Sequence, residues 1–225
     1  KSQDILIIDR DSEYYYFKKL LKDKNLKIEI LHSPFLDLHL ASRDPAVCDY
    51  ALKNMLYSIR FCKELGIKKV VMHTGINPFI PEFRRGETYD ILVSSVRLIL
   101  KDAKAKGINV YFENTYEKDF YYFERLIKDF PELNMALDIP HIWCFSKNSI
   151  NEWLIKFKNQ IKHYHIHDNN QKEDLHLPLG AGTIPFDKIF SCLNKKNTLT
   201  FETALPELEN SINYWVALKD KEPCK

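Results

Sequence analysis

VYFENT, residues 110–115, is a short apolar run that ends in a carboxylate and an amide. Apolar runs that stop at an imidazole or a carboxylate recur at LHS (31–33), VVMHTG (70–75), ALDIPH (136–141), HYHIHD (163–168) and FET (201–203). If these runs are parallel strands closed into a barrel, their ends meet at the C-terminal mouth, where barrel enzymes keep their chemistry. Imidazoles and carboxylates without thiolates indicate a divalent-metal site with open positions.

Strand-like runs alternate with helical patterns along the chain. The predicted strands are rich in β-branched and aromatic residues and cover 5–8, 27–31, 69–72, 110–112, 134–137, 162–166 and 199–201. This alternation predicts βαβ units and a parallel sheet. Because a closed barrel has eight strands, we expect an α/β fold, a TIM (β/α)8-type barrel that lacks its first strand–helix unit in this chain. We expect a partner, a homo-oligomer contact or a docked terminus to cover the open seam.

The helices between the strands have their own start and stop signals. Asp44 before Pro45 predicts a helix start and Gly66 predicts its end, with an apolar stripe formed by Val47, Met55, Ile59, Cys62 and Leu65. Further helices are expected at 88–106, 119–130 and 149–158. Neither a low-complexity linker nor a change in composition interrupts this order, so residues 1–225 are expected to form a single domain.

The composition narrows the class of protein. With 33 basic and 31 acidic residues among 225, the net charge of +2 gives no reason to expect nucleic acid or an anionic membrane as a partner. Five scattered cysteines without a CxxC pair suit a reducing compartment and argue against a thiolate zinc site. Because no apolar run approaches the roughly 20 residues that span a bilayer, we expect a cytoplasmic protein without a membrane anchor.

Two histidines stand directly after predicted strands in matching contexts. His32 precedes Ser33-Pro34, and His73 precedes Thr74-Gly75. A single histidine after a strand is more often a loop residue with satisfied hydrogen bonds, but its recurrence favours a functional site. His39 lacks that context and is expected to be structural.

Glu113 and Glu202 both end apolar strands. A carboxylate in that position is costly unless it is paired or bound to a metal. A salt bridge to one of the many lysines is the alternative interpretation, and exposed pairs of that kind contribute little. We therefore favour a metal.

Two further pairs combine an aspartate with a nearby histidine. Asp138 and His141 flank Pro140, which is predicted to bend the chain so that both side chains reach the mouth. Asp174 and His176 are two apart and come just before a glycine-rich stretch, residues 180–182. Such a pair can chelate one ion, and a polar surface loop is the alternative.

His163, His165 and His167 alternate along one strand and therefore face the same way. They cannot all ligate one ion. His163 is deepest in the run and is expected to be a hydrogen-bonded core residue. The spacing alone does not choose between His165 and His167.

A family resemblance rests on strings that cover nearly the whole chain in order. HSPFLDLHLAS, VVMHTG, VYFENT, ALDIPH, HIHDN, DLHLPLGAGTIPF and FET resemble the xylose isomerase-like barrel superfamily. That superfamily of TIM barrels joins sugar and sugar-phosphate isomerases and epimerases with endonuclease IV, a zinc enzyme that cuts DNA at abasic sites. The resemblance implies that the first strand here corresponds to the second strand of the family.

The endonuclease IV branch holds three zinc ions with nine residues, and each has a matching position here. The resemblance implies His32 and His73 at one ion, Glu113 as a bridge to a second ion that also takes Asp138, His165 and Glu202, and His141, Asp174 and His176 at the third. The family pattern of a histidine three residues before an aspartate selects His165, because Asp168 follows it.

The resemblance also implies catalytic and substrate-binding residues. Glu113 and Glu202 are expected to be catalytic, and substrate contacts are expected from Phe35, Asn114, His167, Arg84 and Arg85. Two positions depart from the endonuclease branch. Phe35 replaces its usual tyrosine, and DIPH lacks its threonine and cysteine.

Two enzymatic functions follow from the resemblance. The first is hydrolysis of a phosphoester, such as abasic-site DNA, by up to three Zn²⁺ ions that activate a water molecule, with Glu113 orienting it. The second is isomerisation or epimerisation of a small sugar or sugar phosphate with Mn²⁺ or Mg²⁺ held by Glu113, Asp138, His165 and Glu202. Near-neutral charge favours the second, but the arginine that such isomerases often carry after the histidine is missing between His165 and Gly182. A barrel kept as a scaffold is a third, weaker interpretation.

Overall fold

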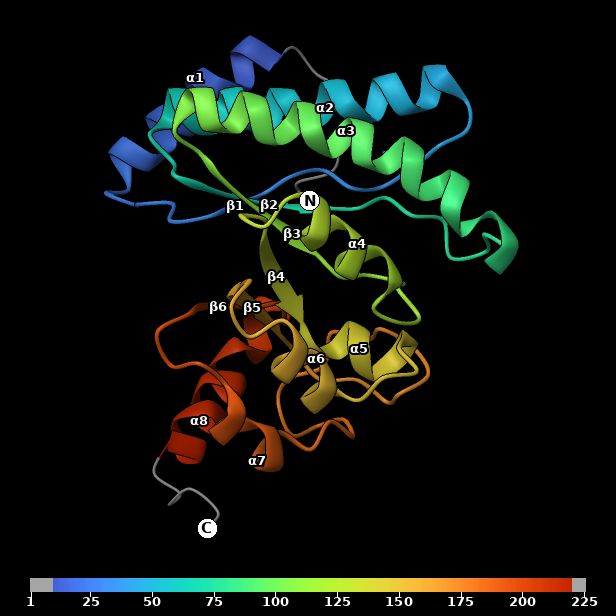
Figure 1. Cartoon of the computed structure of the whole chain (residues 1–225). Helices are drawn as coiled ribbons and strands as arrows, with labels where there is room; N and C mark the ends of the chain where they lie inside the picture. Colours follow the sequence, from blue (N-terminus) through green and yellow to red (C-terminus); the bar gives the residue numbers. More distant parts are fainter. Residues whose placement is uncertain (1–9, 220–225) are drawn as a thin grey trace. The chain divides into compact units, whose positions relative to one another are not determined.

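Strands followed by helices make up both halves of the chain in the computed structural model, which describes residues 10–219 (Figure 1). The chain divides into two units, residues 1–112 and residues 113–225. The predicted strand at 5–8 lies outside the described residues. Within residues 10–219, no helix combines the length and the apolar character needed to cross a membrane.

The first unit contains parallel strands and long helices. Its elements are α1 (Arg10–Asp23), β1 (Leu31–His32), α2 (Pro45–Leu65), β2 (Lys69–His73), η2 (Glu82–Arg84), α3 (Arg85–Lys106) and β3 (Asn109–Glu113), whose last residue begins the second unit. β1 pairs with β2 in parallel, with Leu31 opposite Val70. The Asn109 N–H donates to the Lys68 carbonyl at 2.9 Å. Helices α2 and α3 pack side by side (Figure 1).

Helix α2 begins and ends where its capping residues predict. The Asp44 carboxylate accepts a hydrogen bond from the Ala46 N–H at 2.8 Å, and Gly66 ends the helix in the left-handed region with a φ of 75°. Met55, Ile59 and Cys62 are buried as the apolar stripe predicts, but Val47 is 37% exposed. Val47 was wrongly included because it lies in the first turn, outside the packed face of the helix.

The second unit contains three parallel strands in chain order. Its elements are α4 (Tyr121–Asp129), β4 (Asn134–Asp138), α5 (Ile139–Phe145), α6 (Ile150–Lys156), β5 (Ile161–Ile166), α7 (Phe186–Ile189), η3 (Phe190–Cys192), β6 (Thr198–Phe201), η4 (Leu205–Glu207) and α8 (Leu208–Lys219). β5 pairs with β4 on one side and with β6 on the other, and both pairings are parallel. The predicted parallel arrangement of these strands is confirmed.

Aromatic side chains build the core around helices α4 and α6. The rings of Phe120, Phe123 and Phe157 pack edge-on or tilted against Trp153, with ring centroids 5.1–5.9 Å apart. Helix α6 begins at a capping box, in which the Ser149 and Glu152 side chains bond each other's backbone N–H groups. This start agrees with the predicted boundary at residue 149.

The boundaries of three expected elements differ from the structure. The strand predicted at 27–31 is reduced to Leu31–His32, because Lys27 and Glu29 are exposed and Ile28 and Ile30 are only half-buried. The helix predicted from residue 88 begins at Arg85, because the η2 turn leads directly into it. The helix predicted at 119–130 spans Tyr121–Asp129.

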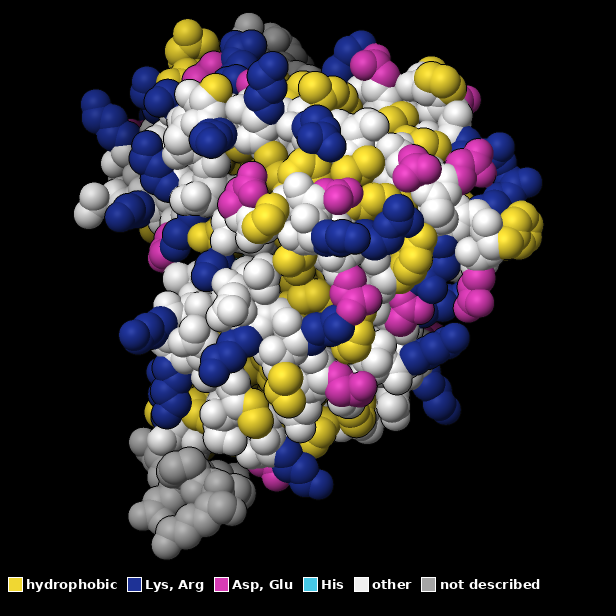
Figure 2. Space-filling model, in the orientation of Figure 1, with side chains coloured by type: hydrophobic (Ala, Val, Ile, Leu, Met, Phe, Trp, Pro, Cys, Tyr) yellow, Lys and Arg dark blue, Asp and Glu magenta, His cyan; other side chains and the backbone are white. Residues whose placement is uncertain are grey.

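Lys and Arg side chains are interleaved with Asp and Glu over the face of the molecule drawn in Figure 2. This mixture agrees with the small net charge of +2.

Candidate metal centre

Four predicted site residues of the second unit meet at the ends of its strands. Glu113 ends β3, Asp138 ends β4, His165 lies near the end of β5 and Glu202 follows β6. The register places Asp138 opposite His165, and the Glu202 N–H donates to the Ile166 carbonyl at 3.1 Å. Because parallel strands present their carboxyl ends at one edge, these side chains converge. We call Glu113, Asp138, His165 and Glu202 the carboxylate cluster.

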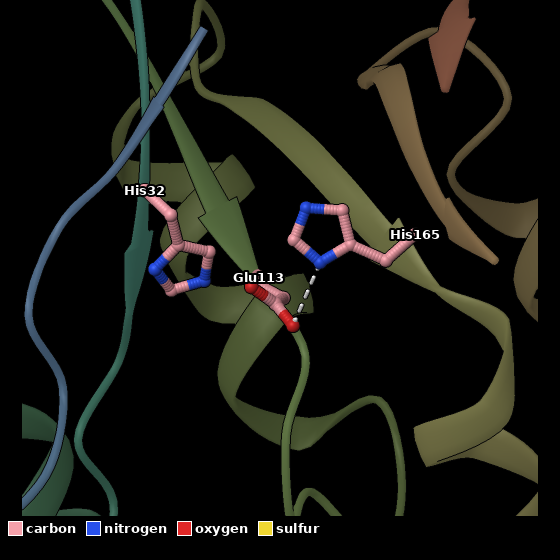
Figure 3. A group of neighbouring side chains, drawn as sticks. All are labelled: His32, Glu113 and His165. Atoms are coloured by element: carbon pink, nitrogen blue, oxygen red, sulfur yellow. Dashed lines mark ion pairs between the residues drawn. The ribbon is translucent and has the colours of Figure 1, made fainter. Parts of the chain in front are cut away.

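His165 is the centre of the carboxylate cluster. Its Nδ1 lies 3.2 Å from Glu113 Oε1 (Figure 3), 3.2 Å from Glu202 Oε1 and 3.8 Å from Asp138 Oδ2. Glu113, Asp138 and His165 are at most 2% exposed. Burial by itself would lower the pKa of His165, but the surrounding carboxylates outweigh it and raise that pKa to about 9. Burial also raises the pKa of Asp138 to about 7.

Asp138 also caps helix α5 and thereby places His141. Its Oδ1 accepts the His141 N–H at 2.6 Å, and Pro140 occupies the first helical turn. Helix α5 begins directly after β4, and it is this helix that carries His141. The signal that could have found this helix is the one recognised at Asp44-Pro45, an aspartate N-cap with a proline in the first turn.

His141, Asp174 and His176 form a second group, which with His167 we call the imidazole cluster. Asp174 Oδ2 lies 3.2 Å from His141 Nε2 and 3.2 Å from His176 Nε2. His141 Nδ1 is 2.9 Å from the Asn114 carbonyl, and His176 Nδ1 is 2.8 Å from the Glu202 carbonyl. Because a carbonyl only accepts, each Nδ1 carries a proton, and each Nε2 is the atom turned toward Asp174.

The charges in the imidazole cluster stabilise one another. Hydrogen bonds from His141 and His176 hold the pKa of Asp174 well below its usual range despite its burial. The hydrogen bond to Asp174 raises the pKa of His176 to about 9. In the metal-free protein, Nε2 of His176 therefore carries a proton at neutral pH, and a cation bound by this nitrogen would displace it.

His167 belongs to the imidazole cluster but differs from the other two histidines. It is fully buried, and burial lowers its pKa to about 3. Its Nε2 is 3.4 Å from Asp174 Oδ1, and its ring stacks on His176 with centroids 3.9 Å apart and planes 14° apart. Two parallel stacked rings cannot both direct in-plane lone pairs at one ion. The stacking therefore allows only one of His167 and His176 to bind a given ion, and the ligand atoms of Asp138, His141 and His167 lie within 4.8 Å of one another.

The donor set fits a divalent cation. Among the described residues, the buried atoms Asp138 Oδ2, His167 Nε2 and Asp174 Oδ1 accept or donate no hydrogen bond, which is costly without a further partner. The ligand atoms of Asp138, His165 and Glu202 lie within 4.8 Å of one another, as do those of Asp138, His141 and His167. Ligands about 2.0–2.2 Å from a zinc ion stand about 3.3 Å apart, so these clusters match a coordination sphere.

The remaining predicted ligands, His32 and His73, lie in the first unit. Their ring centroids are 5.0 Å apart, and the Phe35 ring lies 4.5 Å from the His73 ring. His32 Nδ1 is 2.7 Å from the Ser33 carbonyl, which fixes the orientation of the ring. His39 bonds the Gly75 carbonyl at 3.2 Å, in keeping with the structural role predicted for it.

Two further histidine and amide side chains near the clusters make hydrogen bonds within the protein. His163 bonds Thr198 Oγ1 at 2.8 Å and Thr200 Oγ1 at 3.0 Å, which confirms it as a hydrogen-bonded core residue. Asn114 bonds the backbone of Asp138 reciprocally, at 2.8 and 2.9 Å, so its amide holds the carboxylate cluster in place.

The predicted basic pair stands at the start of α3. Arg84 is exposed and lies over the Phe83 ring, and Arg85 is half-buried.

Comparison with known proteins agrees with this arrangement. A sequence model of the family described as "Xylose isomerase-like TIM barrel" matches residues 3–216. The uncharacterized protein MJ1614 of Methanocaldococcus jannaschii is 28% identical over 75% of this chain and 67% of its own length. A probable endonuclease 4 of Mycoplasma capricolum is 22% identical over 85% of this chain and 72% of its own length.

Solved structures share the fold. A D-tagatose 3-epimerase-like protein superposes with a TM-score of 0.79 at 24% identity, over 93% of this chain and 83% of its own. The predicted barrel class is thereby confirmed, and both endonuclease and epimerase relatives occur. The match over residues 3–216 shows that this chain belongs to the xylose isomerase-like TIM barrel family.

Proposed function

We propose that this chain is a divalent-metal-dependent phosphoester hydrolase of the endonuclease IV type, acting on abasic-site DNA. The observation that carries the proposal is the imidazole cluster. An isomerase of this family needs only the carboxylate cluster. His141, Asp174 and His176 add a second set of donors, in which both imidazole Nε2 atoms lie 3.2 Å from Asp174 Oδ2. Two imidazoles that face the same carboxylate oxygen form a donor set that zinc favours, which supports a second ion.

The proposal assigns each cluster its ligands. Glu113, Asp138, His165 and Glu202 would hold one ion, His141, Asp174 and His176 another, and His32 and His73 supply imidazole donors from the first unit. Bound divalent ions would supply Lewis acidity at a phosphoryl oxygen and lower the pKa of a water molecule. Zn²⁺ suits the imidazoles, and Mn²⁺ or Mg²⁺ are alternatives at the carboxylates.

Residues of this chain would accept a proton and hold the imidazole rings in the orientation that binds an ion. Glu113 is the proposed proton acceptor, because its buried carboxylate is held next to His165. Backbone carbonyls fix the ring orientation of His141 and His176, so neither ring must reorganise when an ion binds.

Substrate contacts are proposed for five residues. They are Phe35, Asn114, His167, Arg84 and Arg85, of which exposed Arg84 is the one most accessible to a phosphate. His167 is fully buried, so in this conformation it would act through Asp174 and His176.

The test is nicking of a DNA duplex that contains one abasic site by metal-loaded protein. Nicking is expected for the wild type and for Glu207→Gln, an exposed control, and is expected to be lost in Glu113→Gln. Absence of nicking by the wild type at full metal loading would remove the proposal.

A specific observation keeps isomerisation or epimerisation as a second candidate. Glu113 and Glu202 both lie 3.2 Å from the same nitrogen of His165, so two carboxylates stand at one site and could exchange protons with adjacent carbons of a sugar. This candidate predicts incorporation of solvent deuterium into a ketose or its phosphate. A panel of sugars without incorporation would count against it.

A further inference from the structure

Asp168 is a fully buried carboxylate that is not among the proposed metal ligands. It follows β5 and lies outside both clusters. Its Oδ1 accepts the N–H groups of Asn169 at 2.9 Å and Ile184 at 3.1 Å, and its Oδ2 accepts the N–H of Gly180 at 3.0 Å. One side chain therefore binds both the beginning and the end of the segment 169–184.

The backbone strengthens this closure. Asp168 and Leu177 exchange N–H···O bonds of 2.8 Å in both directions, and the Thr183 N–H donates to the Asn169 carbonyl at 2.8 Å. Gly182 permits the close approach, because a Cβ there would lie 2.3 Å from both Asp168 Oδ1 and the Asn169 carbonyl oxygen. The segment so closed carries Asp174 and His176.

Asn169 connects the same closure to helix α5. Its Nδ2 donates to the Pro140 carbonyl at 3.0 Å, one residue before His141. The dipeptide Asp168-Asn169 thus touches the two elements that supply the imidazole cluster, the helix with His141 and the segment with Asp174 and His176. Neither residue contributes a ligand atom.

We propose that Asp168 and Asn169 form a clasp that positions Asp174 and His176 against His141, and that the ion-binding geometry of the imidazole cluster depends on the Asp168 carboxylate. The metal part of this inference rests on the proposed function. The closure of the segment 169–184 does not, since it concerns hydrogen bonds within the metal-free chain. Asp168 is a positioning residue in this account.

The test compares Asp168→Asn with the wild type by two measurements. An asparagine keeps the shape but replaces one acceptor oxygen by an NH₂ group, which cannot accept the N–H of Gly180 or Ile184. Because Gly180 and Ile184 bond to different oxygens of Asp168, the metal-free variant should show amide hydrogen exchange at least about tenfold faster at 180 or at 184, whichever faces the NH₂ group. After zinc loading, the variant should lack the equivalent bound by the imidazole cluster and keep the one bound by the carboxylate cluster. Asp187→Asn, an exposed change of the same chemistry, should match the wild type in both.

The outcomes separate the two proposals. If the wild type binds no metal at any concentration, the proposed function fails, while the exchange measurement still tests the clasp. If Asp168→Asn exchanges at 180 and 184 as slowly as the wild type, or exchanges faster but keeps its full zinc content, the positioning role is wrong. Should Asp168→Asn not fold, Asn169→Ala tests the clasp by the same zinc measurement, because it removes the Nδ2 donor to the Pro140 carbonyl; full zinc content in that variant would overturn the positioning role.

Discussion

The carboxylate cluster and the imidazole cluster lie next to each other in the second unit but differ in their metal-binding groups, which are mostly carboxylates in the first and mostly imidazoles in the second. The first combines Glu113, Asp138 and Glu202 with one imidazole, and the second combines three imidazoles with Asp174. Oxygen donors suit Mg²⁺ and Mn²⁺, whereas imidazole donors favour Zn²⁺. We therefore expect two ions bound at these clusters to differ in selectivity.

The two clusters also differ in the secondary structure on which their residues lie. Strand ends position Glu113, Asp138 and His165, whereas His141 lies on a short helix and Asp174 and His176 on the segment 169–184. Sites on strands are held more rigidly than sites on loops. We therefore expect the carboxylate cluster to keep its geometry when the imidazole cluster is disturbed.

The largest effect is expected from Glu113→Gln. The amide keeps the volume but removes the charge next to His165 and the proposed proton acceptor, so kcat should fall by about 10²–10⁴-fold. The melting temperature should stay near that of the wild type. Steady-state kinetics with a duplex that contains one abasic site measures the loss, and an unchanged kcat would rule out a catalytic role for Glu113.

Removal of the imidazole cluster's only carboxylate should affect zinc binding strongly and selectively. In Asp174→Asn, one class of zinc site should weaken by more than about 100-fold, because the charge shared by His141 and His176 is lost. Manganese binding at the carboxylate cluster should change little. Calorimetric titration with each metal checks this, and equal weakening of both metals would contradict the separation of the clusters.

The metal-free protein should lose stability as the pH rises. His165 and His176 have pKa values of about 9 in the folded state against 6.5 ordinarily, so each contributes stability that is fully present below pH 6.5 and lost as the pH rises through 9. The raised pKa of Asp138, about 7, acts in the same direction between pH 4 and 7. The Tm without metal should therefore fall from pH 6.5 to 9.5, and bound metal should flatten that decline. A metal-free Tm that rises over this range would contradict these assignments.

The smallest effect is expected at His163, which shares a strand face with His165. Thr198→Val removes one of its two hydroxyl partners and should lower the free energy of unfolding by about 1–3 kcal/mol. Metal content should not change. Chemical denaturation and elemental analysis measure the two quantities, and loss of metal would show that His163 is not merely structural.

Much of the fold could be predicted from local signals. Asp44-Pro45 and Gly66 define α2, and the apolar runs before Glu113 and Asp138 define β3 and β4, because caps and alternating strands and helices act over a few residues. The short strand β1 could not be predicted. Its length depends on how far it pairs with β2, which the residues 27–30 do not encode locally.

The candidate site was predicted as a residue list but not as a geometry. Alternation placed His163, His165 and His167 on one face, yet only the partners distinguish them, two threonine hydroxyls for His163 and a stacked ring for His167. These partners are about 10 to 37 residues away, and tertiary packing brings them together. The clasp of Asp168 and Asn169 escaped prediction for the same reason, since its acceptors serve backbone groups of residues 180–184.

We propose above all that the carboxylate cluster and the imidazole cluster bind separate ions. The most direct measurement is anomalous diffraction at the zinc edge from crystals of the full chain soaked in Zn²⁺. We predict one peak within bonding distance of Glu113, Asp138, His165 and Glu202, and another within bonding distance of His141, Asp174 and His176. Crystals that show zinc at neither cluster, or one ion shared by all of these side chains, would contradict the claim.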